Sequence, residues 1–371
     1  MKIYVDDVMP YAMEFFKDLG EVVPFAGRQV EPGQLDDADI LLVRSVTQVN
    51  SALLAGNQRL QFVGTATIGT DHLDTAYLQA RRIPFSNAPG CNAQSVVEYV
   101  LSCLFLLSEI RQQPLQSWTV GVVGVGQIGR RLVSALKALE VTVLQCDPPR
   151  AAAEADFAHV PFAELCQQVD VVCLHIPLVR GGDNSTYHLL DAAALAALPT
   201  EVAIINACRG EVIDNQALLK QQRQQPRDLF LDTWEGEPTI LQELVPFCHI
   251  ATAHIAGHSI EGKARGTEML YQKVCKLLGK TPQWQLADFC PAPIMENLQI
   301  SADFRLSDVQ SLCRMLYDVR RDDALFRYYL ATKGFDWLRK TYPPRREFAS
   351  LQLSGHAIPD YLVQLGFTRQ Q

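Results

Sequence analysis

The chain has 371 residues, of which 48% are hydrophobic and 20% charged, and its formal net charge is −8. This balance is typical of a folded globular protein, and the length exceeds one ordinary core, since domains average roughly 150 residues. The basic residues are scattered and form no stripe, which argues against a nucleic-acid binder. The N-terminus reaches Asp6 and Asp7 before any apolar run of signal-peptide length.

A membrane protein is also disfavoured, because no apolar stretch approaches the roughly 20 residues that a membrane span needs. Residues 96–107 are the most apolar stretch, but Glu98 interrupts them. We therefore predict a buried core helix there.

The ten cysteines are spread singly, with no CxxC pair and no Cys/His cluster of metal-ligand spacing. Several lie inside apolar runs, where a free cysteine behaves as a small hydrophobic residue. We expect no metal site, and a reducing compartment, the cytoplasm. Cys208 lies beside the site discussed below, and we interpret it as buried filler, with a functional thiol as the alternative.

Short apolar runs alternate with helix-length segments through residues 1–280. Nearly continuous β-branched runs of this kind are typical of parallel strands covered on both faces, and the alternation predicts a doubly wound α/β fold. The runs are residues 3–5, 40–43, 62–66, 119–125, 141–146, 169–175, 202–207, 229–232 and 249–253.

The strand–helix pattern occurs twice, which predicts two parallel-sheet domains with a cleft between them. The first comprises residues 1–94 and 256–285, because the helical segment 259–279 is expected to cross back to it. The second comprises residues 95–255. The strand–helix alternation does not continue beyond residue 285. We therefore predict that residues 286–371 form a third, α+β domain with a modest core.

A glycine-rich turn follows the apolar run 119–125. Gly124, Gly126 and Gly129 form G-x-G-x-x-G between a strand and a helix, and Asp147 ends the next strand. The glycines allow a tight turn, approach of a pyrophosphate and close helix packing, and the acid can accept hydrogen bonds from ribose hydroxyls. We infer that this Rossmann-type domain binds NAD rather than NADP, although Arg150 is a mild counter-signal. A glycine-rich turn that binds no dinucleotide is the alternative.

Three polar residues follow the last three strands of this domain: Arg209, Glu237 and His254. Ligands of open α/β sheets lie at the carboxyl ends of strands. Arg suits a substrate carboxylate, His can take a hydroxyl proton during hydride transfer, and an acid can orient the imidazole. Each residue also has a structural interpretation. Arg209 can be a surface residue, and His254 can be a hydrogen-bonded histidine of the core. Glu237 can simply begin a turn before Pro238, in which case Glu235 is a candidate for its role.

Three blocks at these positions resemble the signature blocks of the D-isomer-specific 2-hydroxyacid dehydrogenases. They are N-A-C-R-G-E-V-I-D (206–214), L-D-T-W-E-G-E-P (231–238) and H-I-A-G (254–257). The resemblance implies that Arg209 binds the substrate carboxylate, that Glu237 assists, and that His254 is the acid/base. It also implies that Asp232 contacts the nicotinamide carboxamide.

Further blocks narrow the resemblance to one branch of the family, over nearly the whole chain. That branch oxidises 4-phospho-D-erythronate to 2-oxo-3-hydroxy-4-phosphobutanoate in the route to pyridoxal 5'-phosphate. It carries a C-terminal dimerisation domain, which implies a homodimer and assigns residues 286–371 that role. The blocks are residues 43–47, 62–74, 88–100, 146–150, 260–267 and 342–348.

The same resemblance assigns further site residues by motif. Ser45 and Thr67 would contact substrate. The NAD site would include, beside the three glycines, Gln127, Ile128, Asp147, Ile176, Ala207, Cys208, Arg209, Asp232 and Gly257.

One position departs from the branch. After H-I-A-G it commonly has Tyr, which contacts substrate, whereas this chain has His258. A histidine can still donate a hydrogen bond there. We hypothesise that Arg44 binds the substrate phosphate. Arg345 or Arg346 would bind it instead if the third domain reaches the cleft. The remaining alternative is that all three arginines are structural or solvated.

Two other functions stay open. The chain can be another family member, such as a phosphoglycerate dehydrogenase or a hydroxypyruvate reductase. It can also be a non-catalytic, NAD-sensing interaction protein on the same fold, since fold does not determine function.

Overall fold

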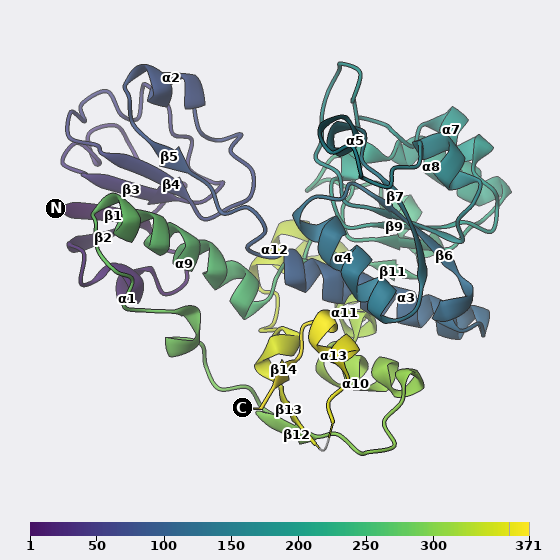
Figure 1. The fold of residues 1–371 in the computed structure, drawn as a ribbon. Coiled ribbons are helices and arrows are strands. Elements are labelled where there is room, and N and C mark those ends of the chain that lie inside the picture. Colours follow the sequence, from purple (N-terminus) through teal and green to yellow (C-terminus); the bar gives the residue numbers. More distant parts are fainter. Residues whose placement is uncertain (356, 371) are drawn as a thin grey trace. The chain divides into compact units, whose positions relative to one another are not determined.

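The computed structural model describes residues 1–355 and 357–370 of the chain (Figure 1). The backbone divides into two compact units. The first comprises Met1–Asn92 and Ser259–Ala292, and the second comprises Ala93–His258 and Pro293–Gln371.

The first unit is built on a five-stranded parallel sheet in the order β2-β1-β3-β4-β5. Its strands are β1 (Lys2–Asp6), β2 (Glu21–Phe25), β3 (Ile40–Val43), β4 (Phe62–Thr65) and β5 (Phe85–Ser86). Its helices are α1 (Ala12–Phe16), α2 (Thr75–Ala80) and α9 (Ile260–Leu277).

Both faces of this sheet are covered, because alternate residues of β3 enter different cores. Ile40 and Leu42 pack with residues of α1 and α9, and α9 lies beside α1 in Figure 1. Leu41 and Val43 pack on the other side with Leu78 of α2. Two-sided burial explains why the strand is apolar throughout.

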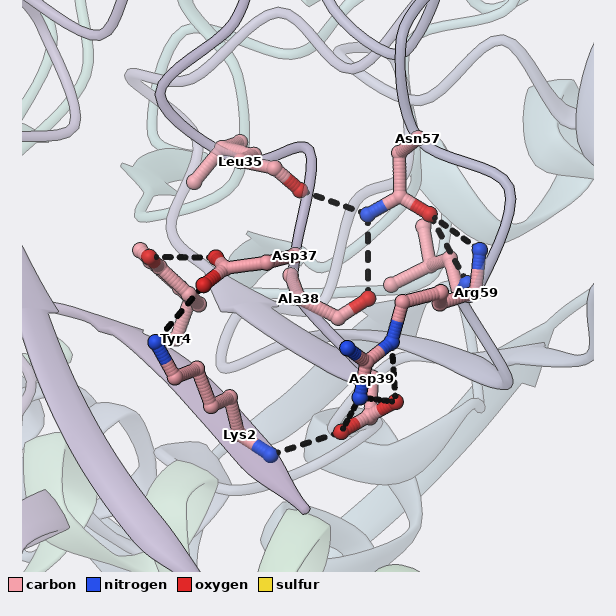
Figure 2. A network of polar contacts seen from close by, with 9 residues as sticks. Lys2, Tyr4, Leu35, Asp37, Ala38, Asp39, Asn57 and Arg59 are labelled. Carbon is pink, nitrogen blue, oxygen red and sulfur yellow. Dashed lines mark hydrogen bonds and ion pairs between the residues drawn. The ribbon is translucent and has the colours of Figure 1, made fainter.

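A polar network links the amino-terminal ends of the strands of this sheet (Figure 2). The backbone N–H of Lys2 donates to Asp39 Oδ2 over 2.7 Å, and Arg59 Nη2 donates to Asp39 Oδ1 over 3.0 Å. The Asn57 side-chain oxygen accepts from the Arg59 N–H over 2.9 Å. Since ligands of such sheets lie at the opposite, carboxyl edge, we read this network as structural.

The second unit contains a six-stranded parallel sheet in the order β11-β10-β9-β8-β6-β7. β7 pairs with one side of β6, and β8 pairs with the other. The strand order therefore reverses between β6 and β8, and open α/β sheets bind ligands at such a switch point. The strands are β6 (Thr119–Val123), β7 (Thr142–Cys146), β8 (Val171–Leu174), β9 (Ala203–Asn206), β10 (Leu229–Leu231) and β11 (Ile250–Ala251).

Helices surround this sheet: α3 (Ala93–Arg111), α4 (Gln127–Ala138), α5 (Pro148–Ala153), α6 (Phe162–Cys166), α7 (Ala192–Ala197) and α8 (Asn215–Gln224). Short 3₁₀ turns occupy Leu115–Ser117, Gly210–Val212, Gln242–Phe247, Leu286–Asp288, Leu306–Asp308 and Phe348–Ser350. Among the helices of the described residues, α3 alone is long and apolar enough to cross a membrane. Because 67% of that window is buried inside the protein, α3 is a core helix, as predicted.

The C-terminal residues form α10 (Val309–Leu316), α11 (Val319–Lys333), α12 (Phe335–Lys340) and α13 (Asp360–Leu365). They also form a parallel sheet of β12 (Asn297–Gln299), β13 (Gln352–Ser354) and β14 (Thr368–Arg369). The compact units do not separate this segment from the second sheet, because Leu312 and Leu362 share one core with Leu104 of α3 and Leu132 of α4. The α/β class with an α+β C-terminal region is thereby confirmed. Division into three domains and a dimerisation role stay predictions.

Candidate active site

The glycine loop joins β6 to α4, and each of its glycines has a different environment. Gly124 has φ 87°, and a Cβ there would lie 2.6 Å from the carbonyl oxygen of His175. A Cβ on Gly129 would lie 2.0 Å from the Gly124 carbonyl oxygen, so only glycine lets the helix pack so closely. Around Gly126, by contrast, a Cβ would meet nothing within 4 Å. The open position leaves the N-terminus of α4 accessible to phosphates, which fits a dinucleotide.

Asp147 ties the end of β7 to this loop. Its Oδ2 accepts a hydrogen bond from the Val125 N–H over 2.8 Å, and its Oδ1 caps α5 by accepting from the Arg150 N–H over 3.0 Å. Arg150 is engaged within the chain: its Nε lies 2.9 Å from Glu154 Oε2, and its guanidinium stacks 4.4 Å from the Phe157 ring. These contacts give no support to Arg150 as a partner of the 2′-phosphate of NADP. Whether Asp147 holds a ribose stays a prediction.

Three other predicted cofactor residues surround the loop. Gln127 begins α4, and its Oε1 accepts from Arg131 Nη1 over 3.3 Å. Ile128 packs on the main core of this unit. Ile176 follows β8, and its Cγ2 would lie 2.7 Å from a Cβ on Gly124.

His175, which directly follows β8, is not among the predicted site residues. Both of its ring nitrogens are buried and lack a hydrogen-bond partner in the described structure. Burial lowers the pKa of His175 to about 4, so the imidazole is neutral at pH 7. The available signal in the sequence was a histidine directly after an apolar strand.

The segment after β9 is organised by Asn206. The Asn206 Oδ1 accepts from the N–H and the Sγ of Cys208, each over 3.1 Å, and its Nδ2 donates to the Arg209 carbonyl over 3.0 Å. Burial raises the pKa of the Cys208 thiol to about 11, so it is a neutral donor. Ala207 is buried beside it. These facts favour structural filler over a nucleophilic thiol.

Arg209 itself is exposed, and its Nη1 donates to the Cys208 carbonyl over 2.6 Å. The next residue, Gly210, packs so tightly that a Cβ would lie 1.9 Å from the Trp234 backbone. The loop carrying Arg209 therefore lies directly against the loop that leads to Glu237.

Glu237 and His254 form a hydrogen-bonded pair. His254 Nδ1 lies 2.8 Å from Glu237 Oε2, and the other oxygen, Oε1, accepts from the Trp234 N–H over 2.9 Å. A carboxylate only accepts hydrogen bonds, so Nδ1 carries the proton and Nε2 of a neutral ring is the basic nitrogen. Within the described residues Nε2 makes no hydrogen bond. The His254 side chain is 31% exposed, so this nitrogen can meet a substrate.

Asp232, which is 1% exposed, accepts hydrogen bonds from the backbone around His254. Its side chain accepts from the N–H groups of Ile255 over 2.7 Å and Ala256 over 3.0 Å. Its carbonyl accepts from the His254 N–H over 2.7 Å. Burial raises the pKa of Asp232, and the nearby His254 opposes that shift. Asp232 thus positions the histidine loop, which the sequence did not indicate; the nicotinamide contact stays a prediction.

Arg345, considered above for the phosphate, is instead buried at 3% exposure. Its Nη2 donates to the Ser95 carbonyl of α3 over 2.5 Å, and its Nη1 donates to the Ala256 carbonyl over 3.4 Å. Glu98 lies 3.5 Å from the same guanidinium. Burial raises the pKa of Glu98 to about 8, assisted by the charge of Glu347 and opposed by Arg345. The C-terminal segment is therefore tied both to α3 and to the histidine loop.

His258 and Gly257 close that loop and are half-buried. The His258 N–H donates to the Ile255 carbonyl over 2.7 Å. Its ring meets the edge of the Tyr342 ring, with 5.8 Å between centroids.

The remaining predicted substrate residues lie in the first unit, after neighbouring strands. Ser45 follows β3 and is exposed. Arg44, beside it, donates from Nε to the buried Asp6 Oδ1 over 2.9 Å. Thr67 follows β4 and donates to the Gly69 carbonyl over 3.0 Å. Arg346, the other outside candidate, lies in the second unit and is half-buried.

The fold and the site define a class of protein. Residues 106–258 match the NAD-binding domain of the D-isomer specific 2-hydroxyacid dehydrogenases, and residues 289–366 match a domain of unknown function. D-lactate dehydrogenase from Aquifex aeolicus, solved with NAD and lactic acid, has a TM-score of 0.58 at 23% identity, over 75% of this chain and 96% of its own. A glyoxylate/hydroxypyruvate reductase from Sinorhizobium meliloti scores 0.61 at 21% identity, over 76% and 96%. At such identities these structures support the fold alone.

Full-length relatives are more specific. The chain is 50% identical over 370 residues to erythronate-4-phosphate dehydrogenase of Pseudoalteromonas translucida, covering 99% of both chains. It is 50% identical over 375 residues to the enzyme of the same name from Aeromonas hydrophila, covering 100% of both. The chain therefore belongs to the erythronate-4-phosphate dehydrogenase family, a branch of the NAD-dependent D-2-hydroxyacid dehydrogenases.

Proposed function

We propose that this chain catalyses the NAD-dependent oxidation of 4-phospho-D-erythronate to 2-oxo-3-hydroxy-4-phosphobutanoate in pyridoxal 5'-phosphate biosynthesis. The full-length similarity to two enzymes of that name supports the substrate. The observation that carries the chemistry is the 2.8 Å contact between His254 Nδ1 and Glu237, which leaves Nε2 as the basic nitrogen.

In this mechanism His254 Nε2 takes the proton of the C2 hydroxyl, while the C2 hydrogen leaves as hydride. NAD, when bound, supplies the hydride acceptor. The ring becomes an imidazolium, and Glu237, 2.8 Å away, stabilises that charge. Because Glu237 is itself held by the Trp234 N–H, the carboxylate stays in place as the charge appears.

Arg209 binds the substrate carboxylate in our proposal. Its exposed guanidinium can form two parallel hydrogen bonds to a carboxylate. Ser45, Thr67 and His258 contact the rest of the substrate, and Arg44 binds its phosphate. Support for Arg44 is that Asp6 engages only its Nε, and no hydrogen bond of the two terminal nitrogens occurs in the described structure.

The cofactor site, in the same proposal, lies along the glycine loop and the neighbouring strand ends. The open position at Gly126 admits the pyrophosphate, and Asp147 accepts hydrogen bonds from the ribose. The full set of proposed NAD-binding residues is Gly124, Gly126, Gln127, Ile128, Gly129, Asp147, Ile176, Ala207, Cys208, Arg209, Asp232 and Gly257.

We further propose a cytoplasmic homodimer that binds neither nucleic acid nor membrane, with residues 286–371 as its dimerisation domain. Residues 1–94 and 256–285 would be the substrate domain, and residues 95–255 the NAD-binding domain. All ten cysteines lie in the described residues as free thiols, which fits a reducing compartment. Sedimentation of the purified protein measures the assembly directly.

The substrate is tested by comparing kcat/KM for 4-phospho-D-erythronate, 3-phosphoglycerate and unphosphorylated D-erythronate, with NAD reduction as the readout. We expect the first to be preferred over both others. Preference for 3-phosphoglycerate would assign the chain to a different substrate, and no NAD reduction with any 2-hydroxyacid would remove the catalytic proposal.

A further inference from the structure

A cavity of about 280 Å³ lies in the second unit, lined by α11, α12 and the backbone that follows β11. Figure 1 shows α11 and α12 in the C-terminal part of the chain, and α11 packs against β11. The walls are largely apolar and aromatic, with Phe326, Tyr329 and Trp337 among them. None of the residues assigned above to NAD or substrate lines it.

The cavity has one buried charged group, Asp322, which is 4% exposed. Its Oδ2 accepts hydrogen bonds from the hydroxyls of Tyr317 and Tyr342, each over 2.8 Å. Its Oδ1 is buried and has no hydrogen-bond partner in the described structure, although Arg321 Nε lies 3.5 Å away. A buried acceptor left without a hydrogen bond is costly, so a donor that reached Oδ1 from the cavity would gain that bond.

We propose that this cavity binds a small planar aromatic molecule that carries a cationic or N–H donor group. The volume is near the lower end of the roughly 300–1,000 Å³ of small-molecule pockets, so it suits one ring. The rings of the walls supply flat apolar contact, and Asp322 selects for a donor and against an anion. That preference differs from the phosphorylated acid proposed as substrate.

Two walls connect this cavity to the histidine loop. Ala253 and Ile255, which line it, are the chain neighbours of His254. Tyr342, another lining residue, packs its ring on that of His258. Because the cavity shares these residues with the histidine loop, we infer that a bound molecule lowers kcat without competing with NAD or substrate. This coupling rests on the proposed function, whereas the binding itself does not.

The test uses benzamidine as the cationic ring, with benzyl alcohol and benzoate as its neutral and anionic counterparts. Binding to the full-length protein is measured by calorimetry and by tryptophan fluorescence, to which the cavity residue Trp337, 37% exposed, contributes. Asp322→Asn removes the charge and keeps an oxygen for the two tyrosines. Leu325→Trp fills the cavity and leaves Asp322 unchanged. Asp336→Asn, an exposed carboxylate on α12, is the matched control.

We expect one benzamidine per chain, bound more tightly than the other two rings. Asp322→Asn and Leu325→Trp should each weaken binding by about tenfold or more, and Asp336→Asn should not. His254→Ala should still bind benzamidine, which separates this site from the proposed catalysis. In the wild type, saturating benzamidine should lower kcat and leave the KM for NAD unchanged.

Equal binding by the wild type, Asp322→Asn and Leu325→Trp would overturn the site, and so would displacement of benzamidine by NAD or substrate. Absence of binding also overturns it. If absence is joined by a changed sedimentation coefficient in Leu325→Trp, a second copy of the chain covers the cavity instead. Binding without any change in kcat would overturn the coupling to the histidine loop.

Discussion

Glu235 and Glu237 lie two residues apart, yet they hold different histidines. Glu237 Oε2 lies 2.8 Å from His254 Nδ1, whereas Glu235 Oε1 lies 2.7 Å from His188 Nε2. The second oxygen of Glu235 accepts from the Asn215 N–H over 3.2 Å. Two chemically identical side chains in one loop therefore have separable roles, one beside the proposed base and one in the packing of α8.

Replacement of each glutamate by glutamine tests this separation. Glu237→Gln keeps the shape but removes the charge that stabilises the His254 imidazolium, so kcat should fall by about tenfold or more with the Kd for NAD unchanged. Glu235→Gln should keep kcat within about twofold, because it stabilises no charge that develops in the reaction. Steady-state kinetics and NAD titration give both numbers. Equal losses of kcat in the two variants would contradict the assignment.

The glycine loop gives a prediction that separates binding from folding. Gly126→Ala should weaken NAD binding by about tenfold or more and keep the melting temperature, because the added Cβ meets no protein atom within 4 Å but enters the space proposed for a phosphate. Gly129→Ala should also lower stability, by about 1–3 kcal/mol, because its Cβ would lie 2.0 Å from the Gly124 carbonyl. Thermal melts with and without NAD distinguish the two. A destabilised Gly126→Ala protein would refute the open position.

Arg44 should have two measurable effects. Arg44→Ala should raise the KM for 4-phospho-D-erythronate more than that for D-erythronate, because it removes a cation proposed for the phosphate. It should also lower stability, because the buried Asp6 loses its partner. The double variant Asp6→Asn with Arg44→Ala should restore stability but not the KM. Equal rises in KM for the two substrates would assign Arg44 a purely structural role.

Glu98 makes stability depend on pH in a definite direction. Its pKa in the folded protein is about 8, whereas an unfolded chain releases the proton near pH 4.5. The folded state therefore binds more protons between those values, and stability should fall as pH rises from 4.5 to 8. Glu98→Gln should flatten this part of the melting-temperature profile. Glu109→Gln, on the same helix, is the control, because Arg314 lowers the pKa of Glu109 and it titrates below this window. A wild-type profile that rises over pH 5–8 would contradict this account.

Much of the fold was predictable because it depends on local pattern. Apolar runs such as 40–43 and 171–174 are buried on both faces of parallel sheets, and the need for glycine at 129 comes from a clash with Gly124, five residues away. The order of Arg209, Glu237 and His254 at successive strand ends followed from the same rhythm. The variants of Glu237 and His254 test the roles of these two residues in the reaction.

Other features depend on contacts that no local pattern encodes. Arg345 meets Glu98 across 247 positions of the sequence, and a single charge inside an apolar helix was the only sign of that contact. The choice between Glu235 and Glu237 needed the position of His188, and the Tyr342–His258 ring contact needed the C-terminal fold. The strand ends were therefore predictable from the sequence, whereas the groups that contact the side chains there were not.

The most direct test of the central claim is a single-turnover measurement on His254→Ala. If His254 is the base, hydride transfer from 4-phospho-D-erythronate to NAD should slow by about 10²–10⁴-fold, since that is the usual contribution of a positioned base. The Kd for NAD should match that of the wild type, because the residue lies outside the glycine loop. Wild-type rates of hydride transfer in a variant that binds NAD normally would contradict the assignment of His254.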